Sequence, residues 1–291
     1  MFAVKTDKLT KFYGKNRGIE QVCLNVEEGD FYGFIGPNGA GKSTTIRLLI
    51  GLINPTAGSA EVLGKNIQKD RTEILSRIGY LPSEAMFYNG MKVRELLAYS
   101  ASLRGKDCSK EAEQLCERLD LDPTRKIGQL SLGNRKKVGI ACALQHDPEL
   151  YILDEPTSGL DPLIQHEFFK LLGERNAKGA TIFLSTHVLS EVGHYCRNAG
   201  VIREGRLLVS GDVASLVHTG AKQIVLRGTN TIPDIPGIQN PKAENDSVSF
   251  MYSGDQKQLI SMLSQLDFRD INISDPSIED VFIDFYTKEG E

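Results

Sequence analysis

A glycine-rich segment, Gly36-Pro37-Asn38-Gly39-Ala40-Gly41-Lys42-Ser43-Thr44, is the feature that most constrains how this chain can fold. The apolar residues 31–35 predict a short buried strand before it, and residues 45–50 predict the first turns of a helix after it. Glycines let successive backbone N–H groups point at an anion, and the start of a helix adds unpaired N–H groups and the positive end of its dipole. In this context the segment predicts a phosphate site, with Lys42 reaching the β- and γ-phosphates and the Ser43 hydroxyl binding Mg²⁺. A glycine-rich turn without a ligand is the alternative, which the flanking strand and helix disfavour.

Length and composition narrow the class of protein. A chain of 291 residues favours two domains, and a net charge of -4 argues against a general nucleic-acid binder. The five cysteines are scattered and form no C-x-x-C pattern, so we expect neither disulfides nor a zinc site, and a reduced cytosolic compartment fits. No apolar run approaches the about 20 residues of a membrane-spanning helix. Any membrane role is therefore expected to depend on a partner.

A second candidate site lies where apolar residues 150–153 run into Asp154 and Glu155. The pattern predicts a buried parallel strand with acids at its carboxyl end, which is the edge where ligands sit in open α/β sheets. We expect Asp154 to hold Mg²⁺ through its water shell, because a hard cation takes oxygen ligands and keeps waters. Glu155, one residue further on, is free to polarise a water as general base. A solvated turn is the alternative, which the apolar run disfavours.

The region between these two sites has a helical pattern. Helices are predicted over 93–103, 111–119 and 132–144, with Ser131 as the N-cap of the last. A helical insertion inside an α/β chain indicates a subdomain, here over about 84–149.

Two further expectations concern the segments before and after the phosphate loop. The helix after the phosphate loop should end near Ile53, ahead of Asn54-Pro55, and Tyr13 should lie in a loop, where it either stacks on a nucleotide base or packs locally.

The last part of the chain differs in character. Strands are predicted at 223–227, 248–252 and 270–273, and a helix at 256–266. The stretch between the first two strands is rich in Pro, Gly and Asn and predicts a loop. A final helix is expected to begin at Asp275-Pro276. These elements predict a small α+β accessory domain over 218–291, after a larger α/β domain over 1–217.

Taken in order, the motifs resemble those of the ATP-binding subunit of an ABC transporter, across residues 1–215. Gly36–Thr44 is similar to the family's Walker A, and Leu150–Glu155 looks like its Walker B with the catalytic glutamate. Ser158-Gly159-Leu160-Asp161 looks like its D-loop, His187 like its switch histidine, and Leu130-Ser131-Leu132-Gly133-Asn134 like its signature. The resemblance implies a P-loop NTPase fold with a RecA-like core, an N-terminal β-subdomain and a helical signature subdomain. It also implies that the chain uses ATP and Mg²⁺.

The resemblance assigns further roles. Tyr13 takes the place of the adenine-stacking aromatic, His187 touches the γ-phosphate, and Ser131 with Gly133 meets the ATP of an opposite subunit arranged head to tail. The signature departs from the family at Leu132 and Asn134, but it keeps the serine and the second glycine. A clearer departure is Ser83, where the family usually has a glutamine that senses Mg²⁺ and links to the membrane subunit. Serine is too short for that reach, and only a metal or water contact is expected of it.

The expected function is therefore that of an ATPase subunit powering a membrane permease, most similar to multidrug and antibiotic exporters with a separate permease chain. Its partners are expected to be the permease, which docks near residues 83–88, and a second ATP-binding subunit in a homodimer, but no nucleic acid. This places it in the cytoplasm, peripheral on the inner face of the cell membrane. One alternative is a soluble ABC ATPase acting on ribosomes or DNA, although the chain lacks a second ATPase domain, a long coiled coil and basic linkers. Another is a non-hydrolysing regulatory module, which the intact Lys42, Asp154, Glu155 and His187 oppose.

Overall fold

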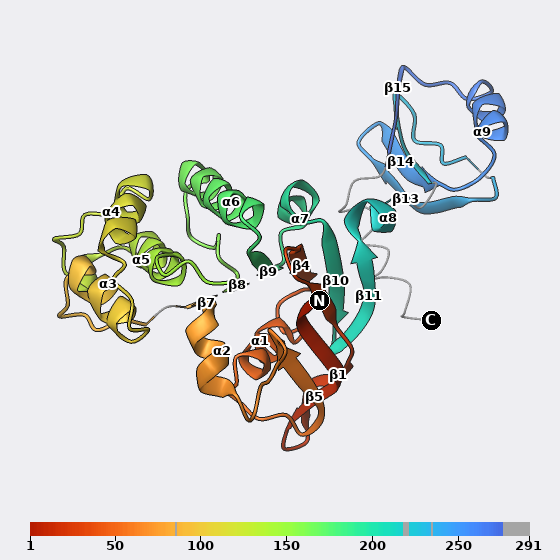
Figure 1. The fold of residues 1–291 in the computed structure, drawn as a ribbon. Helices are drawn as coiled ribbons and strands as arrows, with labels where there is room; N and C mark the ends of the chain where they lie inside the picture. Colours follow the sequence, from red (N-terminus) through yellow and green to blue (C-terminus); the bar gives the residue numbers. More distant parts are fainter. Residues whose placement is uncertain (85, 218–220, 234, 276–291) are drawn as a thin grey trace. The chain divides into compact units, whose positions relative to one another are not determined.

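The computed structural model describes residues 1–84, 86–217, 221–233 and 235–275, and the chain divides into two compact units, Met1–Ser210 and Gly211–Glu291 (Figure 1). This division lies a few residues before the boundary at 217 that the sequence suggests. None of the helices in the described ranges has the length and apolar character needed to cross a membrane.

The first unit contains an antiparallel sheet with the strand order β2-β1-β5-β6, and β3 also pairs with β1. Its strands are β1 (Phe2–Tyr13), β2 (Asn16–Val22), β3 (Asn25–Glu27), β5 (Ala57–Val62) and β6 (Lys65–Asn66). The expectation that Tyr13 lies in a loop is wrong. Tyr13 is the last residue of β1 and is paired with Asn16, because the pairing with β2 continues to the end of the hairpin.

A six-stranded sheet with the order β11-β10-β4-β9-β8-β7 forms the centre of the unit, and its strands from β10 to β7 are parallel. They are β4 (Phe31–Ile35), β7 (Ile78–Leu81), β8 (Leu150–Asp154), β9 (Thr181–Thr186), β10 (Asn198–Arg203) and β11 (Arg206–Asp212). Every residue of β4, β8 and β9 is buried. In the register, Asp154 pairs with Ser185 and Ile35 with Thr186. The carboxyl ends of these three strands therefore meet at one edge, where both predicted sites begin.

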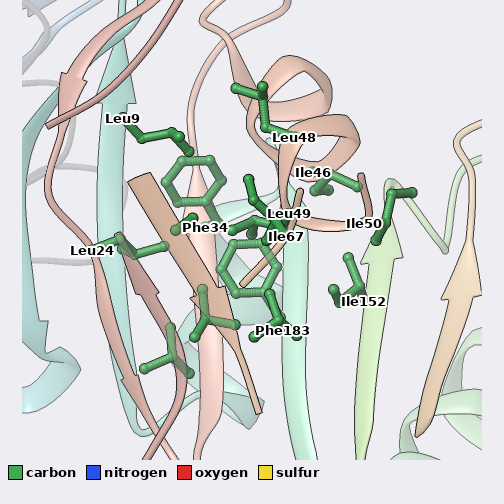
Figure 2. Close-up of a cluster of buried hydrophobic side chains, with 14 of the residues drawn as sticks. Leu9, Leu24, Phe34, Ile46, Leu48, Leu49, Ile50, Ile67, Ile152 and Phe183 are labelled. Carbon is green, nitrogen blue, oxygen red and sulfur yellow. The ribbon is translucent and has the colours of Figure 1, made fainter. Parts of the chain in front are cut away.

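The helix α1 (Lys42–Leu49) packs on this sheet. Its residues Ile46 and Leu49 are fully buried in a cluster with Phe34 of β4 and Phe183 of β9, whose ring centroids lie 5.4 Å apart (Figure 2). Full burial of each such side chain contributes about 1.5–3 kcal/mol to folding. The packing fixes the start of α1 beside the carboxyl end of β4.

The helix α1 ends earlier than the sequence suggests, at Leu49 rather than near Ile53. Gly51 has a φ of 68°, its N–H bonds the carbonyl of Leu48, and the N–H of Leu52 bonds the carbonyl of Arg47. This is the Schellman arrangement that a glycine at this position favours. Gly51, and not Asn54-Pro55, is therefore the signal that ends the helix.

Helices make up the rest of the unit: α2 (Arg71–Arg77), α3 (Val93–Ser102), α4 (Ser109–Arg118), α5 (Leu132–Leu144), α6 (Pro162–Ala177) and α7 (Leu189–Tyr195). Figure 1 shows α3, α4 and α5 grouped together, with α5 in contact with both α3 and β7. The three predicted helices of this region are confirmed, and α5 has the predicted bounds. Arg118 at the end of α4 pairs with Glu167 and Glu174 of α6, which ties the helical region to the core.

The second unit has an antiparallel sheet with the order β13-β14-β12-β15. Its elements are α8 (Val213–Val217), β12 (Lys222–Arg227), β13 (Ile238–Glu244), β14 (Ser247–Tyr252), α9 (Gln256–Leu263) and β15 (Asp270–Ser274). Ile224, Val248, Phe250 and Leu259 form its core. The strand β13 occupies a stretch predicted as loop. The helix expected from Asp275-Pro276 falls on 276–291, outside the described residues.

Candidate functional site

The phosphate loop connects β4 to α1 and ends in a helix start whose geometry suits an anion. Gly41 is the N-cap of α1 with a φ of 110°, a backbone conformation that side chains resist. Lys42, Ser43 and Thr44 form the first turn, where N–H groups have no partner within the helix. The loop itself consists of Gly36, Pro37, Asn38, Gly39 and Ala40. The segment can therefore bind a phosphate through its backbone, as the sequence predicts.

Lys42 lies inside this loop and is almost fully buried. Its Nζ donates to the carbonyl oxygens of Gly36 at 2.5 Å and Pro37 at 3.2 Å. The same atom lies 3.1 Å from Oε1 of Glu155, although the two residues are far apart in sequence. The ammonium group thus joins the loop to the acidic end of β8.

Asp154 and Glu155 have different environments. Asp154 is the last residue of β8, is buried, and accepts a hydrogen bond from the Ser185 hydroxyl at 3.1 Å. Glu155 leaves the strand with a φ of 48°, a sparsely populated conformation for a residue with a side chain, and its N–H bonds the Ser185 carbonyl. Its Oε2 lies 2.6 Å from Nδ1 of His187. The Glu155 carboxylate therefore lies between Lys42 and His187.

The residues that hold His187 were not found by sequence reasoning. The buried Thr186 hydroxyl donates to Oε2 of Glu191 at 2.7 Å and accepts from the N–H of Val188 at 3.0 Å. Burial raises the pKa of Glu191. Ser185, which bonds Asp154, lies in the same strand end. Polar residues closing an apolar strand, as in Leu184-Ser185-Thr186-His187, were the signal available in the sequence.

The donor set at this edge fits Mg²⁺. Ser43 in the first turn of α1 and Asp154 at the end of β8 offer oxygen atoms, the ligands that this ion prefers. Within the described ranges, no group of three or more His, Cys, Asp or Glu residues could hold a metal. An ion held by few protein oxygens, with waters and phosphate as its other ligands, is the form that Mg²⁺ takes at nucleotide sites.

A second cluster forms around the start of α5. Ser131 is the N-cap, as predicted, and its Oγ accepts from the N–H of Asn134 at 3.3 Å. Gly133 packs so closely on the carbonyl of Gly159 that an added Cβ would lie 2.8 Å from it. Asp161 caps α6, with its carboxylate accepting from the N–H of Ile164 at 3.1 Å. These contacts join the signature-like segment to the segment ending at Asp161. A separate set joins Lys42 to Glu155 and Glu155 to His187.

Tyr13 and Ser83 differ in how their surroundings support the predicted roles. Tyr13 is 45% exposed, and Lys11 Nζ lies 5.4 Å from the centroid of its ring. Ser83 makes a contact through its backbone, because its carbonyl accepts a hydrogen bond from Nζ of Lys136 at 2.8 Å.

Burial lowers the pKa of Lys136 to about 8, while the charges of Asp154 and Glu155 oppose that shift. Lys136 was not predicted, although a basic run at 135–137 inside an apolar helix was a signal for it.

Comparison with known proteins places this site in a family. The family model described as ABC transporter matches residues 19–158. The bacitracin transport ATP-binding protein BcrA of Bacillus licheniformis is 36% identical, over 96% of each chain. This chain belongs to the ABC transporter ATP-binding proteins. The ABC ATPase is also 33% identical to the Nod factor export ATP-binding protein I of Sinorhizobium fredii, over 97% of this chain and 85% of the relative.

Solved structures agree with this assignment. An ATP-binding subunit of an ABC transporter matches with a TM-score of 0.69 and 32% identity, over 74% of this chain and 91% of the other. An ATP-binding cassette solved as a dimer in a post-hydrolysis state with ADP and Pi matches with a TM-score of 0.66 and 25% identity, over 72% and 98%. The predicted P-loop fold is confirmed, and the ABC ATPase is an ATP-binding, ATP-hydrolysing subunit that powers transport.

Proposed function

We propose that this ABC ATPase drives export through a separate integral-membrane permease, and that a second copy of the chain completes each ATP site. The name of the Nod factor export ATP-binding protein supports export as the direction, and the name of the bacitracin transport ATP-binding protein supports transport in general. Both relatives match over most of their length, so their organisation as ATP-binding chains supports a permease on another chain. Transport is favoured over work on ribosomes or DNA because both relatives are named for transport or export.

The contact of Glu155 with both Lys42 and His187 is the observation that carries the proposed chemistry. The loop amides and Lys42 would bind the β- and γ-phosphates. Ser43, and Asp154 through water, would hold Mg²⁺, which would neutralise phosphate charge. When Lys42 turns to the phosphates it leaves Oε1 of Glu155, and that carboxylate can then accept a proton from the attacking water. The water oxygen bonds the γ-phosphorus while the bond from that phosphorus to ADP breaks, so that ADP and phosphate leave. His187 positions Glu155 and the γ-phosphate. Tyr13 stacks on the adenine ring.

Exposed apolar residues support a head-to-tail pair of chains. Leu132, beside Ser131, is 76% exposed, and Leu163, just after Asp161 and Pro162, is 82% exposed. Large apolar side chains in such neighbouring positions are expected to be covered by a partner. Ser131 and Gly133 would then offer the start of α5 to the ATP held by Lys42 of the other chain.

The loop between β7 and α3 is the proposed permease contact. Met86 and Tyr88 are 93% and 69% exposed, and Phe87 is half-buried between them. Docking there would hold the chain on the cytoplasmic face of the membrane.

The test is co-expression with the membrane protein encoded by the neighbouring reading frame. The ATPase should enter the membrane fraction only in the presence of that protein, and vesicles containing both should hydrolyse ATP faster than the ATPase alone. Equal membrane binding without the membrane protein would contradict the proposal.

A further inference from the structure

Lys136 is a buried lysine whose charge has specific partners. It lies in α5 with 5% of its surface exposed, and its Nζ donates to the carbonyl oxygens of Ser83 at 2.8 Å and Pro82 at 3.3 Å. A buried ammonium group is costly unless hydrogen bonds and opposite charges satisfy it. Here the two carbonyls supply the bonds, and the charges of Asp154, Glu155 and Glu84 favour the ammonium form. The side chain thus connects α5 to the residues after β7, which are distant in sequence.

Both connected segments lie beside residues to which roles in hydrolysis are proposed. Pro82 and Ser83 directly follow β7, which pairs with β8 so that Leu81 lies opposite Leu153, next to Asp154. Lys136 is five residues after Ser131, about 7.5 Å along the axis of α5. Past Ser83 the chain enters the exposed loop with Met86 and Tyr88. One ammonium group therefore joins α5 to the start of the exposed loop, directly after the strand that pairs with the acidic strand β8.

We propose that Lys136 is a positioning residue that ties α5 to the end of β7 and so holds the start of α5 and the loop after Ser83 in register with Asp154 and Glu155. Ser83 is too short to bridge these segments with its own side chain, and its backbone carbonyl serves instead as the acceptor for Lys136. An ammonium group does not ligate Mg²⁺, so Lys136 acts through the alignment of the site. The inference rests on the roles proposed for Asp154 and Glu155, which Glu155→Gln tests on its own.

Lys106 offers a control for the loss of a lysine–carbonyl bond. It is an exposed residue of the loop between α3 and α4, and its Nζ donates to the carbonyl of His146 at 2.9 Å. Lys106→Met removes a similar bond at a place where no role in the ATP site is proposed. If the loss of any such bond in the helical region slowed turnover, both methionine variants would be slow, whereas a loss of alignment should affect Lys136→Met alone.

The experiment compares purified full-length wild type with Lys136→Met, Lys136→Arg and Lys106→Met, by ATP turnover, ATP affinity and amide hydrogen exchange of residues 78–91. Lys136→Met should lower turnover about tenfold, since misplacement of a site from outside costs factors of this order or more. Its ATP affinity should stay within about threefold of wild type, because the phosphate loop is untouched. Exchange over 78–91 should be faster. Lys136→Arg should restore at least half of the turnover, and Lys106→Met should match wild type in both readouts.

Three results would overturn the proposal: turnover of Lys136→Met within twofold of wild type, Lys136→Arg as slow as Lys136→Met, or an equal loss in Lys106→Met. If Lys136→Met does not fold, Lys136→Gln decides. Its neutral and shorter side chain should slow turnover at least about threefold with unchanged affinity. Wild-type turnover and exchange in a folded Lys136→Gln protein would contradict the positioning role. A loss caused by a wrong assignment of Glu155 is distinguishable, because Glu155→Gln would then retain turnover.

Discussion

His187 Nδ1 lies 2.6 Å from Oε2 of Glu155, a contact between the residue after β9 and the residue after β8. The register of the two strands makes this contact possible. Asp154 and Ser185 are paired, β8 ends at this pair, and β9 ends one residue after it. The left-handed backbone of Glu155 and the hydrogen-bonded Thr186 fix the two side chains. The candidate base is therefore held by the sheet itself, ahead of any ligand.

A shared active site predicts complementation between two defective chains. Lys42→Ala and Ser131→Ala should each occlude little ATP as a homodimer, because both sites then carry a lesion. In a verified mixed dimer the two lesions can fall in one site, and the other site keeps both intact residues. Occluded nucleotide should then recover to close to one per pair. A mixed dimer without recovery would mean that Ser131 does not serve the ATP of the opposite chain.

The exposed loop after Ser83 should carry permease recruitment. Phe87→Glu together with Tyr88→Glu should reduce recovery of the chain in membranes that contain the permease, because carboxylates would have to be desolvated in the contact. ATP affinity of the isolated chain should be unchanged. Leu103→Glu, at a residue that is 67% exposed just after α3, is the control for added charge. Unchanged recruitment of the double variant would place the docking surface elsewhere.

Stability should fall in mild acid because of His146, which is 3% exposed and whose Nε2 lies 3.0 Å from the carbonyl of Ile78. Burial lowers the pKa of His146 to about 4, below its ordinary value of 6.5. As pH falls from 6.5 to 4 the unfolded chain takes up a proton that the folded chain does not, which favours unfolding. The free energy of unfolding should lose about 2 kcal/mol between pH 7 and 5 through this residue. Above pH 7 it contributes no slope.

His146→Gln keeps an amide donor for the Ile78 carbonyl and removes the titration. Denaturant unfolding at pH 7 and pH 5 should therefore show a smaller loss of stability for the variant than for wild type. An equal loss in both proteins would show that His146 does not titrate in this range.

The second unit should be dispensable for nucleotide binding. Its described residues form their own sheet and core, and the candidate site lies entirely in the first unit. A chain truncated after Asp212 should bind ATP with an affinity within about threefold of the full chain, as expected when no binding contact is lost. A soluble and folded truncation that no longer binds ATP would contradict the modular organisation.

The sequence predicts best those elements whose signals are local. The helix 132–144 with its cap Ser131 and the strand ending at Asp154 follow from short patterns, and the structure confirms them. The strand β13 was missed because Pro241 and Asn240 suggest a loop. In the structure it is an edge strand with a register shift between Gln239 and Lys242, and an edge with a bulge tolerates such residues.

The contacts of the site could not be predicted in the same way. The pairs Lys42–Glu155 and Lys136–Ser83 join residues that only the order of strands brings together, and no spacing along the chain encodes them. No role was predicted for Lys136, which the packing of α5 on β7 buries.

The most direct test of the account is Glu155→Gln, measured by ATP affinity and by turnover in the same preparation. The amide keeps the size of the side chain and removes its capacity to accept the proton of the attacking water. ATP affinity should stay within about threefold of wild type, and turnover should fall by roughly 10²-fold or more. Turnover near the wild-type value would contradict the role of Glu155 and with it the proposed mechanism.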